Sequence, residues 1–216
     1  MKIQEKFFKK LLVEGNDDQH VIWALCEKNK LKENFDVIDC GGIEKLNNEI
    51  EVRLKSTDIL DFDTLGIIID ADSDINKRWS TLKKMLIQKG FNLTNELPPS
   101  GLVYKNAEEV KIGIWIMPNN NLNGMLEDFI RFLVPKDDLL LPIANETLEQ
   151  IEKQNLNQYN TIHKSKTLIH TWLAWQEDPG TPMGLSITKK YLTTDEETCN
   201  KFVNWLKELF KPEETF

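Results

Sequence analysis

Short apolar runs that end at glycine or at an acid alternate with amphipathic segments along most of this 216-residue chain. The clearest run is LGIIID, residues 65–70, which is continuously apolar and therefore typical of a strand buried on both faces of a parallel sheet. Residues 7–13 end in an apolar run, residues 35–40 alternate between apolar and polar side chains, and residues 111–117 are a further predicted strand. Apolar residues at helical spacing follow these four segments, at residues 17–30, 43–54, 75–89 and 125–134. This alternation predicts an α/β fold with a mainly parallel sheet flanked by helices.

The remainder of the chain has mostly helical patterns. Helices are predicted near residues 145–155, 161–175 and 195–210, with Thr194 or Asp195 as the cap of the last one. Residues 92–110 contain a Pro-Pro pair and few apolar residues, which predicts either a short hairpin or a loop across the sheet edge. We therefore expect a domain at residues 1–135 and a helical C-terminal extension at residues 136–216, packed on the same core.

Hydropathy argues against a membrane protein. The hydrophobic fraction is 40% and the charged fraction is 29%, as in a soluble globular protein. No apolar run approaches the roughly 20 residues that span a bilayer. The N-terminal segment MKIQEKFFKKLLVEG has no small-residue cleavage site, so it predicts a first strand and not a signal peptide. These features predict a cytoplasmic location.

The net charge and the cysteine positions limit which ligands and metal sites the chain is expected to have. A net charge of −8 argues against a broad basic face for nucleic acid. Carboxylates that hold metal ions would add to that negative charge, and the bound ions would reverse its local sign. Cys26, Cys40 and Cys199 are far apart and have no CxxC spacing, so they predict neither a disulfide framework nor a zinc site.

Several acids fall where a parallel sheet would bring them together. Glu14 ends the first apolar run, and Asp70 ends the LGIIID run, followed by Asp72 and Asp74. Ligands of open parallel sheets bind outside the carboxyl ends of the strands, so these side chains are expected to converge there. Clustered carboxylates repel unless protons or cations neutralise them, and hard oxygen ligands suit Mg²⁺ or Mn²⁺. The alternative is that the acids are helix caps and solvated turns, and for Asp74 a helix cap is the preferred interpretation.

Two motifs carry a resemblance to a known family. LLVEGNDDQHVI, residues 11–22, resembles the first Toprim motif: a hydrophobic strand, Glu-Gly, and an acid four residues after the glutamate. GIIIDADSD, residues 66–74, resembles the second, in which a hydrophobic strand runs into Asp-x-Asp. VIDCGGIEKL, between them, resembles the middle strand and glycine turn of that fold. Toprim domains occur in topoisomerases, bacterial primases, recombination-mediator proteins, RNA-maturation nucleases and OLD-family nucleases.

The resemblance to Toprim domains covers roughly residues 7–130, and the ordered pair of motifs carries it. The whole chain is also similar to a group of stand-alone Toprim-related prokaryotic proteins. That similarity extends to the tail segment TLIHTWLAWQEDPGTPMG, residues 167–184. The group implies no activity of its own, whereas the distant likeness to OLD-family nucleases implies a nuclease.

The resemblance implies roles for particular residues. Glu14 matches the motif glutamate, a general acid/base or metal ligand, and Asp18 matches the acid of the first motif. Asp70 and Asp72 match the metal-binding Asp-x-Asp. In OLD-like nucleases a further downstream acid completes a two-metal site, and Glu127 would take that role here, unless it is an ordinary exposed helix acid. Two ions about 4 Å apart would clamp both the attacking and the leaving oxygens of a phosphodiester.

The tail adds a catalytic candidate and an aromatic pair. Lys166 would stabilise charge that develops on the phosphoryl group, and the related proteins carry a basic residue at this point. A solvated lysine at a helix start is the alternative. Trp172 and Trp175 lie three residues apart beside Leu168, so burial of both is expected, with base stacking as the alternative.

Three functions remain open. The preferred one is a metal-dependent phosphodiester enzyme, a nuclease that acts on DNA or RNA. The alternatives are a primase-like nucleotidyl transferase and a non-catalytic Toprim module that binds nucleic acid or a protein partner. No tyrosine lies in a recognisable topoisomerase motif. The pattern GxxxxGK[ST] is absent from the sequence, so any ATPase function would come from a protein partner, as would a basic surface.

Overall fold

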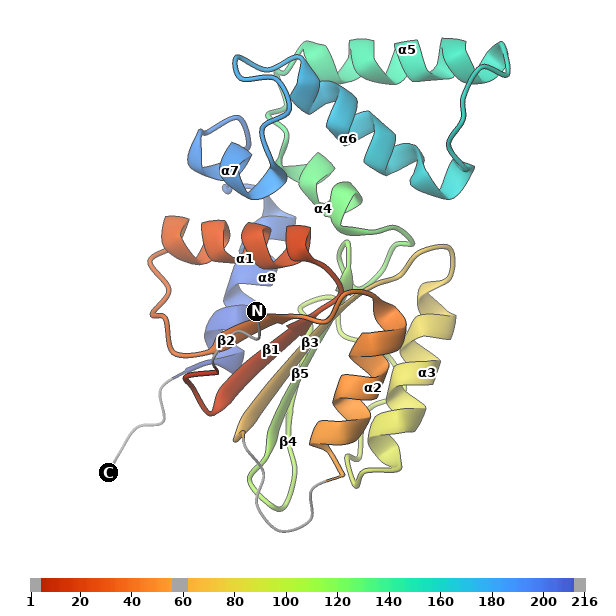
Figure 1. Cartoon of the computed structure of the whole chain (residues 1–216). Helices are drawn as coiled ribbons and strands as arrows, with labels where there is room; N and C mark the ends of the chain where they lie inside the picture. The colour runs from red at the N-terminus through yellow and green to blue at the C-terminus, as the bar shows by residue number, and fades with distance from the viewer. Residues whose placement is uncertain (1–4, 56–61, 212–216) are drawn as a thin grey trace.

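A five-stranded sheet lies at the centre of the computed structural model, which describes residues 5–55 and 62–211. The strands are β1 (Lys9–Val13), β2 (Asp36–Asp39), β3 (Thr64–Asp70), β4 (Leu102–Lys105) and β5 (Lys111–Met117). Their order is β2-β1-β3-β5-β4, and only the pairing of β4 with β5 is antiparallel (Figure 1). The predicted mainly parallel sheet is confirmed, and residues 92–110 contribute its antiparallel edge strand.

Helices cover both faces of the sheet. α2 (Ile43–Arg53) and α3 (Ile75–Ile87) lie on one face, and α1 (Asn16–Lys28) and α8 (Glu197–Leu209) lie on the other (Figure 1). Leu11 packs with the α1 and α8 side, whereas its neighbour Leu12 packs with the α2 and α3 side. Successive strand residues point to opposite faces, so one central sheet supports two apolar clusters.

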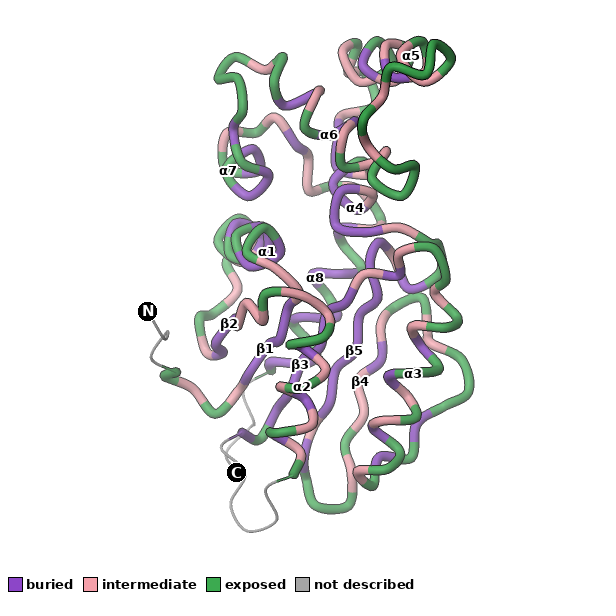
Figure 2. Tube along the Cα trace, turned by 45° about the vertical axis from the view of Figure 1, so that its right-hand side comes forward, coloured by how far each residue is buried: buried purple, intermediate pink, exposed green. Residues whose placement is uncertain are grey.

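The other helices gather beyond the carboxyl ends of the parallel strands. They are α4 (Leu126–Leu133), α5 (Leu140–Lys153), α6 (Lys164–Ala174), which follows the short 3₁₀ turn η1 (Thr161–His163), and α7 (Met183–Thr188). Figure 2 shows that the strands are largely buried and that α5 is the most exposed of these helices. The structure thus contains a helical C-terminal region, and α4 connects it to the edge of the sheet.

Two paired glycines let α8 lie against the sheet. Gly66 of β3 is directly opposite Gly113 of β5. A Cβ atom at Gly113 would lie 2.7 Å from Cδ1 of Leu209, and one at Gly66 would lie 2.9 Å from Cδ2 of the same leucine. The missing side chains therefore form the depression that receives Leu209, which ties the C-terminal helix to the central strands.

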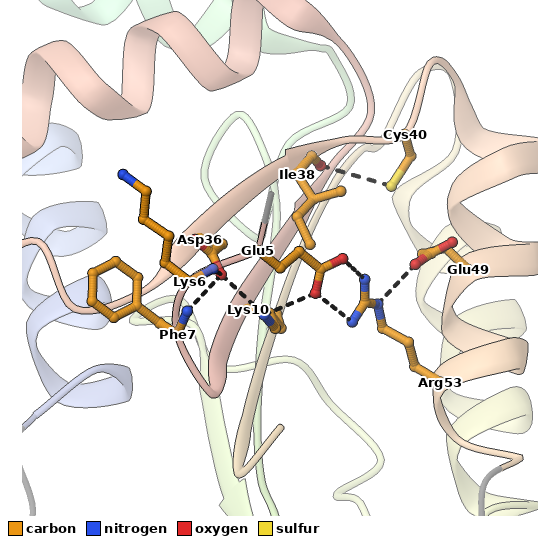
Figure 3. A network of polar contacts seen from close by, with 9 residues as sticks. All are labelled: Glu5, Lys6, Phe7, Lys10, Asp36, Ile38, Cys40, Glu49 and Arg53. Carbon is orange, nitrogen blue, oxygen red and sulfur yellow. Dashed lines mark hydrogen bonds and ion pairs between the residues drawn. The ribbon is translucent and has the colours of Figure 1, made fainter. Parts of the chain in front are cut away.

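An ion network joins the N-terminal segment and α2 to the amino ends of the strands (Figure 3). Nζ of Lys10, which is only 3% exposed, lies 2.9 Å from Asp36 Oδ2 and 2.8 Å from Glu5 Oε2. Arg53 of α2 donates to Glu5 Oε1 at 2.6 Å and to Glu49 Oε1 at 2.8 Å. Because every charge in the network has an opposite partner, its burial is tolerated. It lies at the opposite end of the strands from the predicted site.

Some sequence predictions are wrong in detail. α8 begins at Glu197 with Glu196 as its N-cap residue, so neither Thr194 nor Asp195 caps it. Trp172 is fully buried, as predicted, but Trp175 is 41% exposed. Trp175 follows the last residue of α6, so helical spacing no longer sets the direction of its side chain.

Two exclusions can be compared with the structure. All three cysteines are free thiols, as their spacing predicts. Within residues 5–55 and 62–211, no helix has both the length and the apolar character needed to cross a bilayer. Residues 1–4 of the segment for which a first strand is predicted lie outside the described residues, and β1 begins at Lys9.

Candidate functional site

A cleft of about 580 Å³ opens at the carboxyl edge of the sheet. It is lined by the segments that follow β1, β2 and β3, by the start of α4, and by residues from η1 and α6. Seven of its lining residues are acids: Glu14, Asp17, Asp18, Asp39, Asp70, Asp72 and Glu127. Two are basic: His163 and Lys166. The fold thus brings the six residues singled out in the sequence to one cleft, although they span more than 150 positions of the chain.

Parallel pairing places Glu14 beside Asp70. β1 and β3 are neighbours in the sheet, and each of the two acids lies at the carboxyl end of one of them. Glu14 Oε1 accepts a hydrogen bond from the backbone N–H of Asp70 at 2.8 Å. Asp70 Oδ1 in turn accepts from the backbone N–H of Leu126 at 3.1 Å. The two strand-end acids are therefore joined to each other and to the start of α4.

Two further acids come from the first turns of helices. Asp18 of α1 is buried, and its Oδ2 accepts from the backbone N–H of Gly15 at 3.0 Å. Glu127 of α4 is only 4% exposed, so the interpretation as an exposed helix acid is wrong. Its Oε1 lies 3.4 Å from Nζ of Lys166. Lys166 is about half exposed, but it faces the acids of the cleft and not only solvent.

Burial and mutual repulsion disfavour the ionised forms of these acids. Burial, reinforced by the charge of Glu14, raises the pKa of Asp18 to about 7. Burial, followed by repulsion from Asp18, Glu14 and Glu127, raises the pKa of Asp70 well above its ordinary range. Burial also raises the pKa of Glu14, against the opposing effects of the Asp70 N–H and of Arg78. The cleft therefore has too little positive charge, and protons or cations would stabilise it.

Asp72 lies at the rim and has a cationic partner. Its φ of +51° is in the left-handed region, and its backbone N–H and C=O both pair with Gly124 at 2.8 Å. The carboxylate accepts from the guanidinium of Arg78 on α3. Asp74, two residues on, caps α3 by accepting from the N–H of Lys77 at 3.0 Å, as predicted.

The donor set suits a hard divalent cation, but the side chains are not arranged around one. Carboxylate oxygens are the ligands that Mg²⁺ and Mn²⁺ prefer. In the part of the chain that the structure describes, no three Asp, Glu, His or Cys residues form a group that could hold a metal ion. Glu14, Asp70 and Asp72 each accept from a protein donor instead. A cation would therefore bind here only after these side chains reorient, and the second oxygen of each carboxylate could serve as a ligand.

Three ionisable residues that line the cleft were not among the predicted site residues. Asp39 ends β2 just as Asp70 ends β3, so the strand-end argument could have identified it. Its Oδ1 accepts from the N–H of Gly41 at 2.8 Å. Asp17 is exposed in the first turn of α1, and its position beside Asp18 is the available signal. His163 reaches the cleft only through the path of the chain between α5 and α6, which no local pattern indicates.

Comparisons with known proteins give a family and one loose structural likeness. The model of a family described as "Protein of unknown function (DUF3226)" matches residues 8–211. No curated protein matches the chain. The C-terminal region of the OLD protein from Xanthomonas campestris pv. campestris is 16% identical, with a TM-score of 0.38 over 94% of this chain and 85% of that chain. A similarity this loose carries no argument, so the chemistry of the site rests on its own geometry.

Proposed function

We propose that this chain, which belongs to the family described as "Protein of unknown function (DUF3226)", is a Toprim-like nuclease that hydrolyses phosphodiester bonds of DNA or RNA with Mg²⁺ or Mn²⁺. One observation carries the proposal. Glu14 and Asp70, from the two motifs that resemble Toprim, are joined by a hydrogen bond from the Asp70 N–H to Glu14 Oε1, and they line a cleft that Asp18 and Glu127 also line. A buried acidic cluster of this kind is unfavourable unless cations or protons compensate it, and metal-dependent phosphoryl chemistry uses such clusters.

The acids of the cleft would have separate roles as metal ligands and as a general base. Asp70 and Asp72 would hold a first ion, and Asp18 or Glu127 would help to hold a second. When bound, the ions would neutralise the phosphate and lower the pKa of an attacking water. Because Glu14 Oε1 accepts from the Asp70 N–H, Oε2 is the atom left to take the proton of that water. Burial raises the pKa of Glu14, so its carboxylate is a stronger base than that of an ordinary glutamate.

Lys166 would bind the phosphate group of the substrate. Its ammonium lies 3.4 Å from Glu127 at the cleft, so it could contact a phosphate oxygen that enters beside the acids. A positive charge held there would stabilise charge developing during displacement. Among the described residues that line the cleft, His163 is the other basic one besides Lys166. A long nucleic acid would therefore be drawn here by the bound ions, or by a protein partner that supplies a basic surface.

One observation favours a second candidate, a non-catalytic module. Every acid of the strand ends already accepts from a protein donor, and the described residues contain no preformed metal-binding group. A cluster satisfied in this way can exist without ions, as part of a surface that binds a protein or nucleic acid. Metal binding and cleavage are therefore the properties that distinguish the two candidates.

The test is a cleavage assay on supercoiled plasmid, single-stranded DNA and RNA, with Mg²⁺ or Mn²⁺ and with EDTA. Asp70→Asn keeps an oxygen that can accept from the Leu126 N–H but removes the ligand charge. Activity should fall by about 100-fold or more, because the charge of a ligand sets the metal affinity. Asp74→Asn is the matched control: it lies in the same DADSD segment, and asparagine caps a helix as well as aspartate does.

The outcomes separate the candidates. Loss of cleavage in Asp70→Asn with activity retained in Asp74→Asn supports the nuclease. Equal cleavage by wild type and Asp70→Asn would show that the activity does not come from this site. Absence of cleavage on all three substrates, together with absence of Mn²⁺ binding in calorimetry, would favour the non-catalytic module.

A further inference from the structure

We propose that Arg78 couples metal binding to phosphate binding: it neutralises Asp72 until a divalent cation takes that carboxylate, and its released guanidinium then binds a phosphate of the substrate strand. The inference rests on the proposed function, since it treats Asp72 as a metal ligand. It assigns a role to a residue of α3 that belongs to neither motif and does not line the acidic cleft.

Asp72 lies between two hollows of the surface. Asp72 lines the acidic cleft, and it also lines a separate cavity of about 240 Å³ between α2 and α3. Its backbone is held by the paired hydrogen bonds with Gly124, so the loop has little freedom to move. A change at Asp72 is therefore a rotation of the side chain, from a partner in one hollow to a partner in the other.

Arg78 lines the cavity between α2 and α3 but does not line the acidic cleft. It lies in the second turn of α3 and lines the cavity between α2 and α3, together with Asn47, Lys77 and Thr81. Its guanidinium pairs with Asp72, which lines the same cavity. Once Asp72 turns toward a cation, Arg78 remains in a cavity whose other acid, Asp74, is already engaged in capping α3.

The ion pair between Arg78 and Asp72 is open to exchange, with a cation replacing Arg78 as the partner of Asp72. The side chain of Arg78 is 26% exposed and that of Asp72 is 33% exposed. Solvent reaches both side chains and weakens the pair, so a divalent cation at the cleft can compete for Asp72. In contrast, a planar guanidinium binds phosphate through two parallel hydrogen bonds. Lys77, in the same cavity, adds a second positive charge for the strand.

The exchange makes an unusual prediction for Arg78→Gln, because its two effects have opposite signs. Mn²⁺ binding, measured by calorimetry without nucleic acid, should strengthen by about threefold, since the ion no longer competes with a guanidinium. Binding of a fluorescent 12-nucleotide single strand, measured by anisotropy with non-cleaving Ca²⁺ present, should weaken by about tenfold or more, since a charge-assisted contact is lost. Arg78→Lys should fall between wild type and Arg78→Gln in both assays.

Lys84→Gln is the matched control. It removes the same charge from the same helix, two turns away and outside both hollows, so both affinities should stay within about twofold of wild type. Arg78→Gln binding Mn²⁺ as wild type does or more weakly, or binding the oligonucleotide unchanged, overturns the role of Arg78. If wild type still cleaves in that case, the nuclease proposal stands alone. If the opposite-sign pattern is found without any cleavage, the coupling stands and the nuclease proposal fails.

Discussion

Replacing Asp18 by Asn is expected to stabilise the metal-free protein at pH 8. An ordinary aspartate has a pKa of 3.8, and burial beside Glu14 raises the pKa of Asp18 to about 7. Each pKa unit corresponds to about 1.4 kcal/mol, so ionised Asp18 costs the folded protein up to about 4 kcal/mol. Asparagine removes that charge and keeps an oxygen that can accept from the Gly15 N–H. The expected gain in the free energy of unfolding is about 1 to 4 kcal/mol, because the buried amide offsets part of it.

The sign of the pH dependence follows from the same pKa. Because the folded state holds the proton of Asp18 more tightly than the unfolded state does, its contribution to stability is complete below pH 3.8. The contribution is lost as the pH rises through about 7. The advantage of Asp18→Asn over wild type should therefore be larger at pH 8 than at pH 5.

Urea unfolding in EDTA at the two pH values measures this difference. Asp17→Asn is the matched control, since Asp17 is exposed in the same turn of α1. Its effect should stay within about 0.5 kcal/mol at both pH values. An Asp18→Asn protein that is equally or less stable than wild type at pH 8 would refute the idea that repulsion in the cleft opposes folding.

Three other changes probe the site and its support. Mn²⁺ at about 100 times its dissociation constant should raise the free energy of unfolding of wild type by about 2.7 kcal/mol, reversibly with EDTA and much less in Asp70→Asn; equal gains in the two proteins would place the ion elsewhere. Gly113→Ala should lose about 1 to 3 kcal/mol in urea unfolding, because its Cβ would lie 2.7 Å from Leu209 Cδ1; an unchanged midpoint would contradict the close packing of α8. Asp36→Ala should lose about 3 kcal/mol, since buried Lys10 would keep only Glu5 as a partner; a loss below about 1 kcal/mol would mean that water replaces the carboxylate.

The edge of the sheet that carries the site could be predicted from the sequence. Continuous apolar runs ending at Glu14 and Asp70 identify buried parallel strands, and parallel strands place their carboxyl ends together. From this rule alone, Glu14 and Asp70 are expected at the same edge of the sheet, although they are far apart in the sequence. The sequence did not predict α7, whose six residues are too few for a periodic pattern, and for the segment that contains β4 it left a hairpin and a loop open.

Only the tertiary structure decided what each acid contacts. Glu127 is buried because α4 begins over the strand ends, and its own helix pattern does not distinguish it from an exposed acid. Asp72 has a left-handed backbone and pairs with Arg78 of α3, a contact that sequence spacing does not encode. Local patterns record which residues prefer burial and where strands end. The partner of a charge depends on the orientation of side chains from different elements, which is set by the packing of the whole chain.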